Sequence, residues 1–204
     1  MGRTVAWAEE MLTAHGTDPT IVVFDSCIGA VGRLRASGYA PVDTMTVLLS
    51  EGPVESAGRA TATVYERPAA DRWARAYLEA FYGDQELAPR IVPIVTRLLR
   101  LDPVTLLEAR AGGDTAGVLA LFRTRGLAGV YCVGTVPGHR RKGVAGTLLS
   151  RAKAIAEDER RRLVLQALAS DGSTRYYLKR GFKALYSKQL MSKESSNAKE
   201  KEHL

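Results

Sequence analysis

The hydrophobic positions of the chain follow two alternating periods, one typical of helices and one typical of strands. From about residue 60 onward, apolar side chains at i, i+3 and i+4 predict helices, and β-branched or alternating runs predict strands between them. The helices expected in this region cover residues 68–81, 89–101, 144–158 and 173–180, and the strands cover 60–65, 105–110, 116–123, 128–135, 162–167 and 182–191. This alternation predicts a domain of mixed α/β class over residues 59–191.

The first fifty residues show the same two periods in a shorter arrangement. We expect a helix, a strand, a helix and a strand at residues 4–15, 20–24, 27–36 and 41–49. The polar, turn-rich segment 51–58 is the best candidate for a linker between this N-terminal α/β extension (residues 1–50) and the domain that follows. Residues 192–204 lack apolar periodicity, and we expect a disordered tail there.

A site for an anion is predicted where the strand at 128–135 leads into the helix that begins near Val144. The first N–H groups of a helix lack intrahelical partners, and the helix dipole adds partial positive charge at that end. Basic residues come just before this helix and small residues open it, namely Arg140, Arg141, Lys142, Gly143, Ala145 and Gly146. These residues indicate a nucleotide or coenzyme pyrophosphate bound at the turn, because the main chain is accessible and positive charge surrounds it.

Composition limits the classes of protein to consider. The chain has 204 residues, of which 46% are hydrophobic and 25% charged, a balance typical of globular proteins. The formal net charge is +7, with arginines spread along the chain. The densest basic run outside the loop, at 160–162, has no aromatic residue among its members that could stack on bases, so the sequence does not favour nucleic-acid binding.

The cysteines and the N-terminus indicate a cytoplasmic protein. Cys27 and Cys132 lie in apolar surroundings without metal-ligand spacing, so we expect buried thiols, no disulfide and no metal. No segment approaches the roughly 18 apolar residues of a membrane span. The first ten residues carry two acids where a signal peptide needs an apolar stretch.

Two motifs resemble signatures of the GNAT superfamily of acetyl-CoA-dependent N-acetyltransferases. Residues 140–145 (Arg-Arg-Lys-Gly-Val-Ala) match the pattern Arg/Gln-x-x-Gly-x-Gly/Ala, and residues 177–182 (Tyr-Leu-Lys-Arg-Gly-Phe) match Tyr-x-x-x-Gly-Phe. They occur in this order with a helix and a strand between them. The resemblance implies a mixed, mostly antiparallel central sheet with helices on both faces, with acetyl-CoA as the acyl donor and no metal.

The resemblance also implies roles for individual residues. The main chain of Val133, Gly134 and Thr135 would pair with the pantetheine arm, and Ser173 lies where the family often has a small polar residue near it. The residues expected to bind the coenzyme at the loop and the helix start are Arg140, Arg141, Lys142, Gly143, Val144, Ala145, Gly146 and Thr147. Tyr177 matches the tyrosine that points at the coenzyme sulfur, so its hydroxyl would protonate the departing thiolate as general acid. The adjacent Tyr176 is expected to be a packed helix aromatic.

The general base is not indicated by the resemblance. Several family members carry a carboxylate on the strand before the loop, whereas residues 128–133 here contain no acid. A water chain, Tyr131, Glu108 or an amine that needs little help all stay open. His139 is a candidate only by residue type, and we expect a solvated side chain.

The resemblance predicts an enzyme that transfers an acetyl group from acetyl-CoA to a primary amine by direct attack. The acceptor could be a small molecule or a peptide, and the sequence does not select one. The helix face formed by Trp73, Tyr77 and Phe81 either borders the acceptor pocket or belongs to the core. The alternative function is a catalytically weak acetyl-CoA-binding sensor or interaction module, and a homodimer also stays open.

The first fifty residues repeat the order of the last fifty. The elements expected over 4–49 follow the same helix, strand, helix, strand order as those over 144–191. We therefore expect a degenerate C-terminal half of a second GNAT unit, which lacks the phosphate loop and serves packing. An unrelated α/β extension is the alternative.

Overall fold

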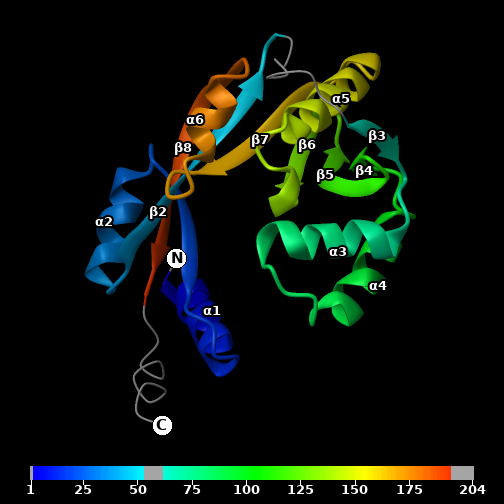
Figure 1. Cartoon of the computed structure of the whole chain (residues 1–204). Helices are drawn as coiled ribbons and strands as arrows, with labels where there is room; N and C mark the ends of the chain where they lie inside the picture. Colours follow the sequence, from blue (N-terminus) through cyan, green and yellow to red (C-terminus); the bar gives the residue numbers. More distant parts are fainter. Residues whose placement is uncertain (1, 53–61, 194–204) are drawn as a thin grey trace. The chain divides into compact units, whose positions relative to one another are not determined.

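The computed structural model describes residues 2–52 and 62–193 (Figure 1). The helices are α1 (Gly2–Ala14), α2 (Ile28–Ala36), α3 (Ala70–Phe81), α4 (Ala88–Leu98), α5 (Val144–Asp158) and α6 (Ser173–Leu178), with a 3-10 turn η1 at Pro137–His139. The strands are β1 (Thr20–Phe24), β2 (Ala40–Ser50), β3 (Thr63–Glu66), β4 (Val104–Ala111), β5 (Asp114–Arg123), β6 (Leu127–Thr135), β7 (Arg162–Leu168) and β8 (Phe182–Ser192). Most of the linker expected at 51–58 and the tail from residue 194 lie outside the described residues.

The strands form one sheet in the order β1-β8-β2-β7-β6-β5-β4-β3. β6 and β7 pair in parallel, whereas β1 with β8, β3 with β4, β4 with β5 and β5 with β6 pair antiparallel. The predicted fold class, a mixed and mostly antiparallel sheet with helices, is therefore confirmed. The N-terminal segment contributes two strands to this sheet, and β2 lies between β8 and β7.

The chain groups into two compact units. The larger unit comprises Leu48–Gln166 and Arg175–Lys183, and the smaller unit comprises Met1–Val47, Ala167–Thr174 and Ala184–Leu204. Several strands and α6 contribute residues to both units.

The larger unit packs helices on both faces of its strands (Figure 1). Its buried cluster joins Trp73 and Val95, from α3 and α4, to Leu106 and Val118 of β4 and β5. The next residue back on β5, Gly117, faces the other side, where an added Cβ would lie 2.7 Å from Val144 of α5. Because neighbouring residues of a strand point to opposite faces, α3 and α4 cover one side of these strands and α5 covers the other.

The sequence of α3 explains how this helix is held against the sheet. Its apolar side chains recur at helical spacing, and Trp73, only 3% exposed, donates a hydrogen bond from its indole N–H to the Leu107 carbonyl at 3.0 Å. On the solvent side, Arg75 pairs with Asp71 one turn earlier at 3.0 Å. The helix is thereby fixed across β4, with its C-terminal end directed toward β6.

The smaller unit has its own core. Val23 of β1, Leu34 of α2, Tyr39 and Met191 of β8 are buried together. One expectation from the sequence is wrong here, because Cys27, predicted to be a buried thiol, is exposed where it precedes α2. An apolar neighbourhood in sequence does not bury a residue at a helix start, where the chain turns at the surface.

Candidate active site

A bulge in β6 lies close to the predicted coenzyme site. The register between β5 and β6 shifts so that two residues, Cys132 and Val133, oppose the single residue Leu119. Cys132 adopts a left-handed conformation with φ of 52°, which is uncommon for a residue with a side chain. Burial raises the pKa of its thiol. The bulge redirects the strand over its last three residues, 133–135, which the sequence had assigned to the pantetheine arm.

The edge of β6 that faces β7 is paired over only part of its length. Within the described residues, the parallel register joins 127–130 to 162–165 and ends at Val130. Beyond this point β5 still pairs with one side of β6 as far as Thr135. The other side of residues 133–135 presents main-chain groups at which an extended ligand arm could pair as an added strand.

The loop after β6 brings the chain to the start of α5 with open N–H groups. Arg141 and Gly143 both have positive φ, 63° and 81°, and Gly143 precedes the first helical residue, Val144. Within the part of the chain that the structure describes, no side chain caps this helix start. The first N–H groups of α5 therefore keep their capacity to bind an anion, as the sequence predicts.

A cavity of about 190 Å³ lies at this loop, entirely within the larger unit. Its lining residues are Thr135, Arg140, Arg141, Gly143, Val144, Ala145, Tyr176 and Arg180. Six of these eight were predicted from the sequence to bind the coenzyme. Whether they do so stays a prediction.

The basic residues of the loop have different contacts. The Arg140 guanidinium donates to two main-chain carbonyls, of Thr135 at 3.3 Å and of Ala80 at 3.1 Å. Lys142 donates to the Gly138 carbonyl at 2.8 Å. These two side chains brace the loop, and Arg141 is a cavity-lining guanidinium without such a contact among the described residues.

Tyr176 and Arg180 are the cavity residues that the sequence reasoning missed. The Arg180 guanidinium lies over the Tyr176 ring, 3.5 Å from its centroid, and one of its terminal nitrogens donates to the Tyr176 carbonyl at 3.1 Å. Its Nε is buried without a hydrogen-bond partner among the described residues. Burial raises the pKa of Tyr176, and the charge of Arg180 opposes that shift. The sequence predicts a helix over 173–180, and the spacing of four residues on that helix was the available signal for this pair, although α6 itself ends at Leu178 and Arg180 lies in the turn after it.

Tyr177, the predicted general acid, is a half-buried residue of α6. Its ring meets Tyr176 edge-on at 5.2 Å between centroids and Phe182 at 5.7 Å. The two motif positions, Tyr177 and Phe182, are therefore in direct ring contact. Ser173 opens the same helix, and its N–H donates to the Asp171 carboxylate at 2.7 Å.

The aromatic face of α3 divides into core and surface. Trp73 is core, whereas Phe81 and Tyr82 are 49% and 60% exposed at the other end of the helix. Gly134 of β6 allows this end to approach, because an added Cβ would lie 2.7 Å from the Phe81 ring. The exposed aromatics therefore lie beside the bulged part of β6. Tyr77 lies between the buried Trp73 and the exposed Phe81 and contacts both rings. Burial and a hydrogen bond with Tyr82 raise the pKa of Tyr77.

Glu108 does not have the environment of a general base. Its carboxylate is fully buried and accepts hydrogen bonds from Arg110 at 2.8 and 3.0 Å and from Thr115 at 2.6 Å, with Arg72 at 3.4 Å. Burial raises the pKa of this carboxyl, but the bonds from Arg110 and Thr115 and the neighbouring charges more than offset this, so the pKa lies below its usual value. A carboxylate that holds four such contacts is occupied as a structural anion.

This arrangement of a bulged strand, glycine-basic loop and helix start agrees with a family comparison. Residues 95–194 match the family model described as "Acetyltransferase (GNAT) domain". The chain carries a GNAT acetyltransferase domain. The matched segment contains both motifs, the bulge of β6 and the whole cavity at the loop.

Solved structures share the fold of this GNAT chain over almost its full length. A functionally unknown conserved protein from Staphylococcus epidermidis ATCC 12228 is 14% identical with a TM-score of 0.71, covering 95% of this chain and 79% of that one. A GCN5-related N-acetyltransferase from Sphaerobacter thermophilus is 22% identical with a TM-score of 0.72, covering 93% and 66%. Another from Kribbella flavida is 16% identical with a TM-score of 0.67, covering 94% and 74%. Among curated proteins, no sequence gave a significant match.

Two further observations concern ligands and membranes. Across residues 2–52 and 62–193, no group of three or more His, Cys, Asp or Glu side chains is arranged to hold a metal ion. No helix in that part of the chain combines the length and the apolar character needed to cross a membrane.

Proposed function

We propose that this protein transfers the acetyl group of acetyl-CoA to a primary amine. The observation that carries the proposal is the cavity at the start of α5, where Arg141, Arg180 and open helix N–H groups converge. Such a constellation suits a diphosphate, because guanidinium forks and main-chain donors both bind phosphate oxygens. The bulge of β6 adds a free strand edge for the arm that would follow the diphosphate.

The residues present fit acetyl-CoA on an independent ground. The buried Nε of Arg180 has no hydrogen-bond partner among the described residues, although its guanidinium lines the cavity. A buried donor without a partner costs about 1–3 kcal/mol, so a bound anion that reorders this side chain would relieve a real penalty. Acetyl-CoA supplies the activated acetyl thioester, and the loop residues would orient it.

Proton transfer would then be divided between the protein and the acceptor. We assign Tyr177 as the group that donates a proton to the departing thiolate. On the other side of the reaction, β6 carries no acid, and the contacts of Glu108 argue against it as base. The amine proton would leave to water, so acceptors of lower pKa would react better near neutral pH.

The exposed aromatics at the end of α3 would form one wall of the acceptor site. Phe81 and Tyr82 are about half exposed, and Phe81 packs on Gly134, which is one of the three residues assigned to the pantetheine arm. An aromatic wall favours amines that carry an apolar or aromatic group, and it attracts the cationic form of the amine. This supports a small-molecule amine as the acceptor.

An acceptor screen tests the proposal. The purified full chain is incubated with acetyl-CoA and a panel of amines, and free thiol release is followed. We expect turnover with at least one primary amine. In the Tyr177→Phe variant we expect kcat to fall by about 10²- to 10⁴-fold while CoA affinity stays the same. Tyr65→Phe is the matched control, because that exposed tyrosine keeps its ring contact with Arg110 when the hydroxyl is removed.

A coenzyme-binding sensor is the second candidate, and the engaged state of Glu108 together with the acid-free β6 favours it. A sensor would bind acetyl-CoA and show no thiol release with any amine, and Tyr177→Phe would change neither property. Turnover that Tyr177→Phe leaves intact would keep the transferase and remove Tyr177 from its role.

A further inference from the structure

A second basic cavity lies in the larger unit, apart from the coenzyme loop. It has a volume of about 750 Å³ and is lined by Arg67, Leu99, Arg100, Leu101, Asp102, Pro103, Val104, Arg123 and Arg161, here named the arginine pocket. Arg67 follows β3, residues 99–104 connect α4 to β4, Arg123 ends β5 and Arg161 precedes β7. Four segments far apart in sequence thus bring four guanidinium groups to one hollow.

The arginine pocket is not neutralised by its neighbours. Arg123 and Arg161 share one carboxylate, that of Glu159, at 2.8 and 2.7 Å. Arg67 and Arg100 are exposed and form no ion pair within the described residues. The four guanidinium groups of the arginine pocket therefore outnumber the carboxylates beside them among the described residues, which are those of Glu159 and Asp102. The positive charge that remains is concentrated in a concave place, where fewer counterions can screen it.

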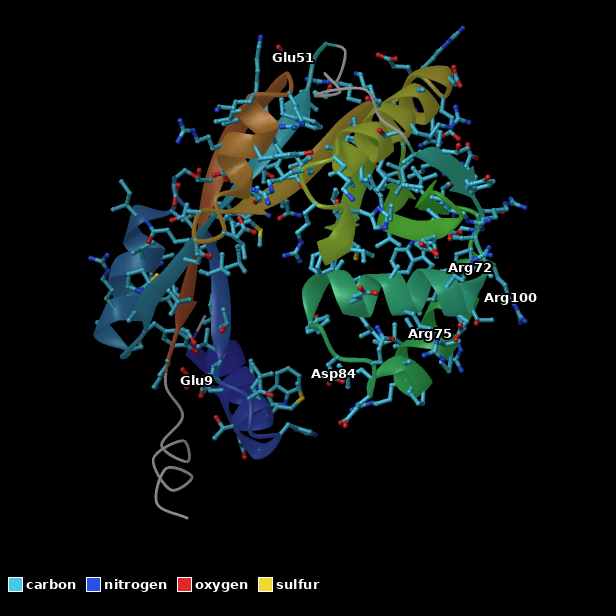
Figure 2. All side chains as sticks on the ribbon, in the orientation of Figure 1. Glu9, Glu51, Arg72, Arg75, Asp84 and Arg100 are labelled. Atoms are coloured by element: carbon cyan, nitrogen blue, oxygen red, sulfur yellow. The ribbon has the colours of Figure 1, made fainter. Side chains whose placement is uncertain are left out.

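The arginine pocket is also separate from the coenzyme loop. Arg123 lies at one end of β5, and Gly117, which pairs with Thr135 beside the loop, lies six residues away toward the other end. Six residues of a strand span about 20 Å. In the view of Figure 2, the labelled Arg72 and Arg100 lie toward one end of α3 and Asp84 lies toward the other end. A ligand in this pocket would not be in contact with the loop.

The chemistry of the lining indicates a phosphorylated small molecule. Unpaired guanidinium groups bind phosphate oxygens through pairs of parallel hydrogen bonds. The volume falls in the range of small-molecule sites, roughly 300–1,000 Å³, and exceeds what inorganic phosphate alone would fill. Leu99, Leu101 and Pro103 supply apolar surface for the rest of such a ligand.

A nucleic-acid strand fits the lining less well. Among the described residues, no aromatic side chain lines the arginine pocket, so bases would find nothing to stack on. The positive groups also surround a hollow, whereas a duplex backbone is bound along an open face. We propose that the arginine pocket is a second anion site, which binds a phosphate ester of a small organic molecule through Arg67 and Arg100.

Residue-resolved NMR on the full chain tests this inference. Inorganic phosphate and then glycerol 3-phosphate are titrated at constant ionic strength, and amide shifts are followed at Leu101, Val104 and Arg123. We expect saturable shifts at these amides with both probes, with the tighter affinity for glycerol 3-phosphate. In the Arg67→Gln/Arg100→Gln variant we expect affinity at these amides to fall by about tenfold or more. Both residues are exposed, so we expect the fold to be kept.

The same NMR spectra distinguish binding at the arginine pocket from binding at the coenzyme loop. Amides 143–146 report the coenzyme loop, and their response should not change in the arginine-pocket variant. Arg35→Gln/Arg90→Gln is the matched control, because it removes the same charge from two exposed arginines elsewhere. Shifts that stay linear, or that both double variants weaken equally, would show a nonspecific ion effect and overturn the site. Tighter binding of duplex DNA at the same amides, with steep salt dependence, would overturn it in favour of a nucleic-acid surface.

Discussion

The guanidinium of Arg140 donates a hydrogen bond to the main-chain carbonyl of Ala80, which lies 60 residues earlier in the chain, at 3.1 Å. The same side chain also donates to Thr135 at the end of β6. Arg140 therefore joins the coenzyme loop to the C-terminal end of α3, which carries the exposed aromatics. The family motif has Arg or Gln at this position, and the contacts of Arg140 make it a brace between the donor side and the acceptor side.

Replacing Arg140 should therefore affect both substrates. In Arg140→Ala we expect the KM values for acetyl-CoA and for the acceptor each to rise, by about tenfold for acetyl-CoA, because the donors of both main-chain bonds are removed. Arg141→Ala should raise only the KM for acetyl-CoA, because Arg141 lines the cavity without contacting α3. Steady-state kinetics with each substrate varied in turn makes the comparison. Equal effects of the two variants on both KM values would contradict the bracing role.

Gly134 should tolerate no larger residue. A Cβ at this position would lie 2.7 Å from the Phe81 ring and 2.9 Å from the Ala80 Cβ, and the latter cannot rotate away. We expect Gly134→Ala to displace the end of α3, to lower the melting temperature and to raise the acceptor KM. Thermal unfolding and kinetics measure the two effects. Gly138→Ala is the control, because no atom of the described residues lies within 4 Å of its added methyl group. A Gly134→Ala protein with unchanged melting temperature would contradict the close approach.

Arg180 should contribute to coenzyme affinity through its planar group as well as its charge. Its guanidinium lies on the Tyr176 ring and lines the same cavity as Arg141. We expect Arg180→Gln to weaken CoA binding by about tenfold or more and Arg180→Lys to restore only part of it, because an ammonium cannot present a fork. Calorimetric titration with CoA measures the affinities. Arg175→Gln, at an exposed position of α6 five residues before Arg180, should bind CoA as the wild type does. If Arg180→Lys bound CoA with the affinity of the wild type, the positive charge of Arg180 alone would account for its contribution, and the planar group would have no role.

The sequence predicted the elements well where a period was long and local. The helix at 144–158 and the strand at 20–24 agree with α5 and β1 residue for residue, and both motifs lie where the resemblance placed them. The tertiary pairing of Tyr176 with the loop cavity was not visible in this way. Two adjacent tyrosines look alike in sequence, and only the rotation of α6 decides which one lines the cavity.

The contacts of charged side chains were also beyond the sequence. Arg140 and Lys142 were predicted to bind the coenzyme by charge, yet both donate to main-chain carbonyls of their own unit. The arginines that form the second cavity come from four separate segments, so their local runs looked like ordinary solvated turns.

The strand order is compatible with a half-repeat. In the half-repeat hypothesis β1 corresponds to β7 and β2 corresponds to β8. Exchanging these partners in the order β1-β8-β2-β7 gives the same order read from the other end. The half-repeat itself stays a prediction.

Glu108 should act through stability rather than through proton transfer. In Glu108→Gln the hydrogen bonds from Arg110 and Thr115 to residue 108 weaken. The guanidinium groups of Arg110 and Arg72 also lose the buried negative charge with which both are paired. Breaking a buried ion pair from one side costs about 3–5 kcal/mol, and we expect the lower end because both arginines reach solvent. Urea unfolding at pH 7 measures the change. With a saturating acceptor, kcat should stay within about threefold of the wild type, since a lost general base would cost at least about a hundredfold.

The structural role of Glu108 can also be checked by the pH dependence of the difference in unfolding free energy between wild type and Glu108→Gln. The pKa of Glu108 is lower in the folded protein than its ordinary value of 4.5, so its stabilising contribution is complete above that value. It is lost as the pH falls from there through the folded pKa, where the native carboxylate takes up its proton. The gap in unfolding free energy between wild type and Glu108→Gln should therefore be constant near neutral pH and narrow below about pH 4.5. Asp71→Asn removes an exposed partner of Arg75 and should change stability little at any pH. A gap that stayed constant down to pH 3, or a kcat loss without a stability loss, would return Glu108 to the list of candidate bases.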